Sequence, residues 1–259
     1  MIKKKFAILV LSSDRYSDLW KPFFKNFFNK INTDNFKIYL ASNKKSFNFK
    51  NVNNIKSGKD IDWSTSYLKI LNKIDEQILF VILEDLFPKT IIDEKKIIKI
   101  FNLMKKKKYN HIKYWPKPIG DIYINNYLKK YTPGAPYRVT VCGFWNKDTL
   151  KKILIPGESP WDFEKNGSYR SKYINDFYSL QSNLFEFVNL IEKGYWIPNS
   201  LKWLMQQNIT FNVRARKKLS GIYLLNSNIK KIIFSIILFI PWKTRLKIVS
   251  FIKNFLISY

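Results

Sequence analysis

The chain has 259 residues, of which 46% are hydrophobic and 17% aromatic, and this composition excludes global disorder. A formal net charge of +27 indicates a polyanionic partner such as nucleic acid, an anionic membrane surface or a phosphorylated substrate, although heavy use of lysine throughout the chain accounts for part of the charge. Cys142 is the only cysteine and His111 the only histidine, which excludes an internal disulfide and a zinc ligand set.

The first hundred residues alternate between predicted strands and predicted helices. The N-terminal apolar run is too short for a signal-peptide core, so we interpret it as a strand. Its unbroken aliphatic residues are typical of a parallel strand that is buried on both faces. The expected strands cover residues 6–11, 36–42 and 77–85, and the expected helices cover residues 17–31 and 63–74. This order predicts a Rossmann-type, doubly wound and mostly parallel α/β sheet.

The second half is less regular. A strand is expected around residues 138–145, followed by a helix after Asn146. Residues 157–171, with the sequence GESPWDFEKNGSYRS, contain turn residues and several acids, and we expect them to form an ordered loop. A long helix is expected near residues 180–193.

The C-terminal segment differs from the rest in composition. No acid occurs from Leu201 to Tyr259, where eleven Lys and Arg residues occur. We therefore divide the chain into a domain at residues 1–215 and a basic amphipathic helical appendage at residues 216–259. The apolar run of the appendage is shorter than the roughly 20 residues that a membrane-spanning helix needs, so we expect it to lie in the interface of an anionic membrane. Packing on the domain's own core and a dimer contact are the alternatives.

Polar residues follow two of the predicted strands, where ligands bind in doubly wound sheets. Ser12, Ser13 and Asp14 end the first strand and could contact a nucleotide, or could simply cap the next helix. Glu84 and Asp85 close the third predicted strand. Two adjacent carboxylates are costly unless a positive charge lies near them, which a divalent cation on a diphosphate would supply.

The acidic loop carries a second candidate site. Trp161 offers an apolar face on which a sugar ring could stack, and either Asp162 or Glu164 could take a proton from a sugar hydroxyl. An exposed acidic turn without function is the alternative interpretation. Four further residues are assigned to the nucleotide sugar: Trp63, Arg138, Arg170 and Lys193.

Six stretches of the chain carry a family resemblance: SSDRYSDLWKPFF, WSTSYLKILNKID, ILFVILEDLF, YRVTVCGFWNKDTLKKIL, GESPWDFEKNGSYRS and IEKGYW. In this order they resemble bacterial GT-A-fold glycosyltransferase-like proteins of capsule and O-antigen clusters, over about residues 5–200. The resemblance implies a GT-A-like fold, and it implies that Glu84 and Asp85 stand where such enzymes carry a metal-binding DxD. It also implies that residues 161–164 correspond to the WxxE loop that supplies the catalytic base. Leu86 stands where many relatives have a second acid, which leaves metal dependence open.

The sequence therefore predicts a nucleotide-sugar-dependent glycosyltransferase that acts on a saccharide acceptor, lipid-linked in the favoured form, with Mg²⁺ or Mn²⁺ as the metal. Glu164 is the first choice for the base and Asp162 the second. The expected location is the inner face of the cytoplasmic membrane. Two alternatives stay open: a basic nucleic-acid-binding protein, for which the chain has no recognisable motif, and a non-catalytic glycosyltransferase-like scaffold.

Overall fold

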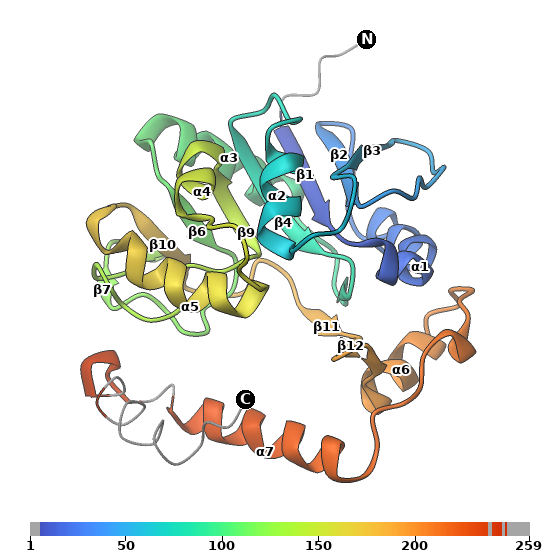
Figure 1. Ribbon diagram of the computed structural model, residues 1–259. Coiled ribbons are helices and arrows are strands. Elements are labelled where there is room, and N and C mark those ends of the chain that lie inside the picture. The colour runs from blue at the N-terminus through green and yellow to red at the C-terminus, as the bar shows by residue number, and fades with distance from the viewer. Residues whose placement is uncertain (1–5, 238–239, 245–246, 248–259) are drawn as a thin grey trace.

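The computed structural model describes residues 6–237, 240–244 and 247, and its centre is a nine-stranded sheet (Figure 1). The strand order is β3-β2-β1-β4-β9-β6-β10-β8-β7. The strands of this sheet are β1 (Phe6–Leu11), β2 (Phe36–Ser42), β3 (Val52–Lys56), β4 (Ile78–Leu83), β6 (His111–Lys113), β7 (Ile122–Tyr123), β8 (Leu128–Lys130), β9 (Gly143–Asn146) and β10 (Phe177–Leu180). The mostly parallel α/β fold that the sequence predicts is confirmed.

The direction of the strands fixes which residues can meet. β3, β2, β1 and β4 pair in parallel, and β6 pairs in parallel with β10. β9 lies between β4 and β6 and is antiparallel to both. The carboxyl ends of β1, β4, β6 and β10 therefore share one edge of the sheet with the start of β9.

Helices cover both faces of the sheet, because successive β-strand side chains point to opposite sides. On β1, Ile8 and Val10 belong to one core cluster, whereas Ala7, Leu9 and Leu11 belong to the other. The helices of the chain are α1 (Ser17–Phe28), α2 (Trp63–Leu71), α3 (Glu94–Lys107), α4 (Lys147–Ile153), α5 (Pro160–Arg170), α6 (Pro198–Met205) and α7 (Gly221–Ile237). Helices α1 and α3 pack on the first cluster, and α2, α4 and α5 pack on the second.

Two predictions about the second half are wrong. The predicted loop at residues 157–171 is mainly helix α5, which continues into a 3₁₀ turn at Ser171–Tyr173. The predicted helix near residues 180–193 instead contains the short strands β11 (Phe187–Asn189) and β12 (Ile191–Glu192). They belong to two small sheets, in which β11 pairs with β5 (Leu86–Pro88) and β12 pairs with β13 (Tyr195–Trp196). A helix-like spacing of apolar residues could not distinguish these alternatives, because tertiary pairing with β5 decides the conformation of β11.

The C-terminal segment begins inside the domain. Residues 217–219 run beside β13, since Trp196 N–H donates to the Lys217 carbonyl and Leu219 N–H donates to the Trp196 carbonyl, both at 2.9 Å. Helix α7 follows and lies below the lower edge of the sheet in Figure 1. Among the described residues, none of the helices is both long enough and apolar enough to span a membrane. Residues 238–239, 245–246 and 248–259 of the predicted amphipathic appendage lie outside the described residues.

Candidate active site

The carboxyl edge of the sheet brings together residues that are far apart in the sequence. Ser12 follows β1, Glu84 and Asp85 follow β4, and Lys113 ends β6. Cys142 enters the same edge directly before β9. The parallel order of β1, β4 and β6 around antiparallel β9 is the reason that these residues converge.

Glu84 and Asp85 are adjacent carboxylates in a largely water-free position. Glu84 is only 5% exposed, and Oδ1 of Asp85 is a buried oxygen for which no hydrogen-bond partner lies among the described residues. Burial raises the pKa of Glu84 well above its ordinary value, and the negative charge of Asp85 raises it further. Burial also raises the pKa of Asp85, to about 6. A cation bound here would relieve both effects.

Arg216 supplies positive charge to this position from a distant part of the chain. Its Nε and Nη2 donate to the two carboxylate oxygens of Asp18 at 2.8 and 2.7 Å, and its guanidinium lies 4.5 Å from the centre of the Tyr16 ring. The charge of Arg216 opposes the rise in the pKa values of Glu84 and Asp85. Sequence reasoning missed Arg216 because it placed the domain boundary at this point.

The residues after β1 serve mainly to hold the neighbouring loop. The carboxylate of Asp14 accepts the backbone N–H groups of Asn43, Lys44 and Lys45 at 3.0 to 3.2 Å. Ser12 accepts the indole N–H of Trp20 at 2.7 Å. A hydrogen bond from Ser12 to Glu84 lowers the pKa of Glu84, against the larger effect of burial. Ser12 thus touches the strand-end carboxylates, whereas Asp14 is committed to backbone groups. Ser13 precedes the 3₁₀ turn Asp14–Tyr16 and makes no side-chain capping bond.

The start of α5 explains its acids in structural terms. Ser159 caps the helix, Pro160 occupies its first turn, and Asp162 completes a capping box, which is a frequent signal for a helix start. Oδ2 of Asp162 accepts the Ser159 hydroxyl at 2.6 Å. This bond lowers the pKa of Asp162, which is fully exposed. Asp162 therefore already has a local role in the fold.

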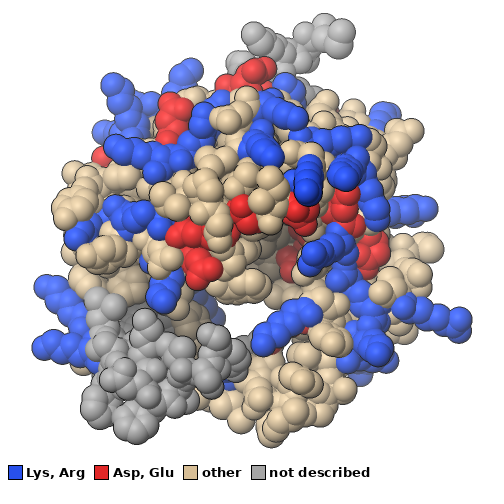
Figure 2. Space-filling model, in the orientation of Figure 1, with Lys and Arg blue, Asp and Glu red and all other residues tan. Residues whose placement is uncertain are grey.

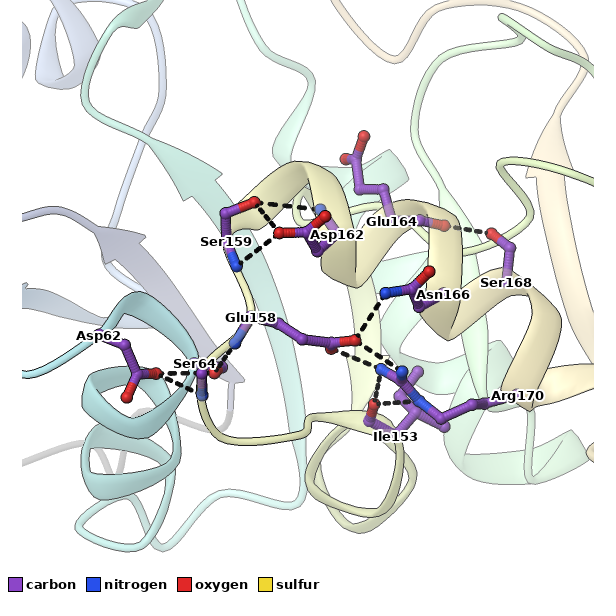
Figure 3. Close-up of polar contacts among 11 residues, drawn as sticks. Asp62, Ser64, Ile153, Glu158, Ser159, Asp162, Glu164, Asn166, Ser168 and Arg170 are labelled. Atoms are coloured by element: carbon purple, nitrogen blue, oxygen red, sulfur yellow. Dashed lines mark hydrogen bonds and ion pairs between the residues drawn. The ribbon is translucent and has the colours of Figure 1, made fainter. Parts of the chain in front are cut away.

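Glu164 lies two residues further on and points inward instead. In Figure 3 its carboxylate points away from the Ser159–Asp162 pair and from the Glu158–Arg170 pair. Oε1 of Glu164 accepts the backbone N–H of Val141 at 3.0 Å. Burial raises the pKa of Glu164, and the Val141 N–H and the charge of Lys113 oppose that rise. Among the three acids of residues 157–171, Glu164 is the one that faces the sheet edge.

Cys142 lies directly before β9, at the same edge of the sheet. Burial raises the pKa of its thiol well above the ordinary value, and the charges of Glu164, Asp85 and Glu84 raise it further. Glu164 bonds to the N–H of the adjacent Val141, so α5 reaches the edge at which β4 ends. Cys142 itself is buried and free and belongs to the core cluster on which α1 and α3 pack.

Lys113 is a second residue that sequence reasoning missed. Its side chain is buried, and its ammonium donates to the Lys117 carbonyl and lies 4.9 Å from the centre of the Trp115 ring. Burial lowers the pKa of Lys113 to about 7, and the charge of Glu164 opposes this. The local sequence did not indicate that Lys113 would be buried at the site, because lysine is abundant throughout this chain.

Four residues assigned to the nucleotide sugar have clear structural partners. Arg138 is fully buried, donates to the Ile174 carbonyl at 2.8 Å and lies 4.2 Å from the Phe177 ring centre. Its Nε and Nη1 have no hydrogen-bond partner among the described residues. Arg170 forms a two-point ion pair with Glu158 at 2.6 and 2.7 Å (Figure 3).

The other two assigned residues lie at the starts of local structures. Lys193 occupies the two-residue turn between β12 and β13 with a φ of 51°. Trp63 opens α2 and packs against Tyr67 and Phe163 at ring-centre distances of 5.4 and 5.5 Å. Trp63 makes no described contact with the carboxylates, and the binding roles of both residues stay predictions. Trp161, by contrast, is 75% exposed on the first turn of α5.

Helix α7 crosses below the carboxyl edge. On one side, Ser227 donates to Glu192 at 2.6 Å, and Leu190 next to β12 donates to the Asp85 carbonyl at 2.9 Å. On the other side, Phe234 meets Tyr137 edge to face at 6.1 Å. Figure 2 shows an opening between α7 and the body of the molecule, with acidic side chains above it. The helix therefore lies on the outer side of this opening.

Among the comparisons with known proteins, one solved structure with a TM-score above 0.5 supports the fold. No protein-family model and no curated protein sequence matches the chain. A UDP-glucose pyrophosphorylase complexed with UDP-glucose is similar, with a TM-score of 0.52 and 9% identity over 78% of this chain and 99% of that one. TarS of S. aureus has a TM-score of 0.48 and 9% identity over 81% of this chain and 41% of that one. The glycosyltransferase GlyE of Streptococcus pneumoniae has a TM-score of 0.42 and 12% identity, over 69% of this chain and 45% of that one.

The class that these observations define is a structural one. The chain has a GT-A-like, Rossmann-type α/β fold, with its strand-end acids at the edge where ligands bind in such sheets. The chain spans less than half the length of full TarS. At these levels of identity the similarity concerns the fold, so the activity must be argued from the site.

Proposed function

We propose that this protein is a glycosyltransferase that moves a sugar from a nucleoside-diphosphate donor to a saccharide acceptor in the synthesis of a bacterial surface polysaccharide. The observation that carries the proposal is the burial of Glu84 and Asp85 at the carboxyl edge of the sheet, together with Glu164, which reaches the start of β9 at that edge through the Val141 N–H. Burial of carboxylates with raised pKa values costs stability, and such costs are typical of functional sites.

Glu164 has the properties of a general base. Its raised pKa makes it a stronger proton acceptor than an exposed glutamate, and the Val141 N–H fixes one carboxylate oxygen while leaving the other available. The acceptor hydroxyl oxygen forms a bond to the anomeric carbon, and the bond from that carbon to the diphosphate oxygen breaks. Glu164 takes the hydroxyl proton, and the nucleoside diphosphate leaves with the bonding electrons.

Glu84 and Asp85 fit a divalent cation, because hard cations take oxygen ligands and Oδ1 of Asp85 is buried without a described partner. Mg²⁺ or Mn²⁺ held there would stabilise the negative charge of the departing diphosphate. Ser12 orients Glu84 by its hydrogen bond, and Arg216 adds positive charge on the same side. No described group of three His, Cys, Asp or Glu residues could hold a metal by itself, so the donor's diphosphate would complete the coordination.

A pair of matched variants tests the assignment of the base. Glu164→Gln should lower the transfer rate by about 10²- to 10⁴-fold, since removal of a general base typically has this effect. Asp162→Asn on the same helix should leave the rate within a few-fold of the parent, because Asp162 is engaged in the capping box. The measurement is transfer from UDP-sugars with Mn²⁺, together with donor binding by thermal shift. Full activity of Glu164→Gln with loss in Asp162→Asn would reverse the two roles.

We also propose that α7 attaches the enzyme to the inner face of the cytoplasmic membrane, near a lipid-linked acceptor. The helix has exposed apolar side chains around much of its surface: Ile222, Tyr223, Leu225, Ile229, Ile232, Ile233, Phe234 and Ile236. An apolar surface of this kind favours burial at the boundary between headgroups and acyl chains, and nearby lysines add about 1 kcal/mol each near anionic lipid.

Flotation with anionic liposomes tests this attachment in the full chain. The double variant Ile222→Glu with Ile236→Glu should lose most of its bound fraction, because each charge would have to enter the apolar boundary. Ile61→Glu is the matched control, since Ile61 is 64% exposed at a position away from α7. Equal flotation of the double variant and the control would remove α7 as the anchor. Donor binding that is absent from all variants would favour a non-catalytic scaffold instead.

A further inference from the structure

The outward face of α5 carries a row of exposed rings and cations. Trp161, Lys165, Tyr169 and Tyr173 recur every four residues, which keeps them on one side of the helix and of the 3₁₀ turn that extends it. The exposed fractions are 75% for Trp161, 66% for Tyr169 and 84% for Tyr173. We name these four residues together with Lys172 the α5 ridge.

Such exposure is unusual for large aromatic side chains, which are mostly buried or half-buried in folded proteins. The opposite face of the same helix is fully used, since Phe163 is buried in the core and Glu164 bonds to Val141. The ridge is therefore not required for packing of α5. Contiguous exposed apolar surface of this kind marks a binding site more often than a structural need.

The ridge also carries positive charge. The ammonium of Lys172 lies 4.5 Å from the centre of the Tyr169 ring and 4.7 Å from that of Tyr173, and Lys165 is exposed between Trp161 and Tyr169. Aromatic faces with interleaved lysines suit a ligand that has flat apolar surfaces and negative charges along its length. An oligosaccharide with acidic groups has both features, because each pyranose ring presents a C–H face.

The α5 ridge extends along the helix from Trp161, near the helix start, to Tyr169 and Tyr173 at its end. Trp161 stands on the first turn of α5, three residues before Glu164, so the ridge begins at the end of the helix that carries the proposed base. Tyr169 lies eight residues beyond Trp161, about 12 Å along the helix axis. This length exceeds one sugar ring, so a ligand that touches both residues contains several sugars. In Figure 1, α5 runs along the lower edge of the body, away from β4 and toward β7.

We propose that the α5 ridge binds an acidic oligosaccharide, and that this ligand is the acceptor chain whose terminal sugar lies at Glu164. The identification of the ligand as an acceptor rests on the proposed transferase function, whereas binding of an oligosaccharide to the ridge does not. The acids around Glu84 and Asp85 disfavour a nucleic acid that continues into the same space, because its phosphates would be repelled.

Glycan binding in the absence of donor tests the proposal. The full chain is applied to an array of short acidic oligosaccharides with their neutral counterparts, and the affinity for the best binder is then measured by titration. Tyr169→Ala with Tyr173→Ala should raise the Kd about tenfold or more, as expected for central aromatic contacts. Tyr123→Ala is the matched control, because Tyr123 is 60% exposed on the β7 strand, outside the ridge. The control should bind like the parent.

Each other outcome overturns the proposal. If the parent binds no glycan, or if the double variant binds the glycan with the same Kd as the parent, the ridge is removed as a glycan site. Tighter binding of neutral than of acidic oligosaccharides would contradict the acidic ligand. Stronger binding of a single-stranded oligonucleotide through the same tyrosines would make the ridge a nucleic-acid site. A parallel flotation assay should give equal liposome binding for parent and double variant, and a loss there would make the ridge a membrane contact. Donor binding by thermal shift separates this proposal from the transferase, because its failure would leave glycan binding intact.

Discussion

The exposed or ion-paired acids in α5 and directly before it differ from the acids at the end of β4 in the groups that stabilise their negative charges. Glu158 forms a two-point ion pair with Arg170, and Asp162 closes the capping box, and in both the pKa is lowered by hydrogen bonds. Glu84 and Asp85 are buried beside each other, and their pKa values are raised. The first pair stabilises the fold, whereas the second pair is kept at a cost that a bound cation would remove.

The difference predicts that removal of a strand-end charge stabilises the protein while impairing the site. Burial raises the pKa of Asp85 from 3.8 to about 6, so the folded state holds a proton that the unfolded state releases between these values. The stability of the folded state therefore falls as the pH rises through this window, by up to about 3 kcal/mol. Asp85→Asn should reduce this fall, to which Glu84 and Glu164 still contribute through their own raised pKa values, and should raise the free energy of unfolding at pH 7.

Urea unfolding between pH 4 and pH 7.5 measures this effect. The parent should recover stability at neutral pH when Mn²⁺ is added, because the cation binds the folded carboxylates, and the Asp85→Asn protein should recover less. Transfer activity of the variant should be strongly reduced. A variant that is less stable than the parent at pH 7, with an unchanged pH dependence, would mean that Asp85 is a structural acid like Glu158.

The sequence was sufficient for the α/β class and for the central parallel strands β1, β2 and β4, because long apolar strands and amphipathic helices alternate over residues 6–104 and short connections leave few arrangements. It also singled out Glu84, Asp85 and Glu164 as candidates, since acids are few in this chain, and their roles stay predictions. It failed where local and distant signals compete. The Gly, Pro and Ser residues of 157–160 indicate a turn, yet they cap a helix that then continues for eleven residues.

Long-range contacts account for what else was missed. Arg216 reaches Asp18 across 198 residues, and nothing in the local sequence distinguishes it from the basic residues around it. Lys113 is buried beside Glu164 because β6 is placed next to β9, which depends on the order of strands and not on the residues of β6. The order of charged residues along the chain does not show which Lys and Arg side chains become buried when the protein folds.

The smaller prediction concerns the paired acids. Arg170→Met should lower the free energy of unfolding at pH 7 by about 1 kcal/mol, because the ion pair with Glu158 is partly exposed and therefore screened. Hydrogen bonds from Arg170 and Asn166 lower the pKa of Glu158, so this contribution is present above the unfolded pKa of the carboxyl group and disappears as the pH falls through its folded value. Parent and variant should thus converge in stability under acid conditions. The contrast with Asp85→Asn lies at pH 7, where Arg170→Met should be less stable than the parent and Asp85→Asn more stable. Lys152 is an exposed cation on α4, and Lys152→Met is therefore the control for loss of one positive charge.

Donor binding and transfer should persist in Arg170→Met. Loss of donor affinity without loss of stability would instead assign Arg170 to the nucleotide sugar.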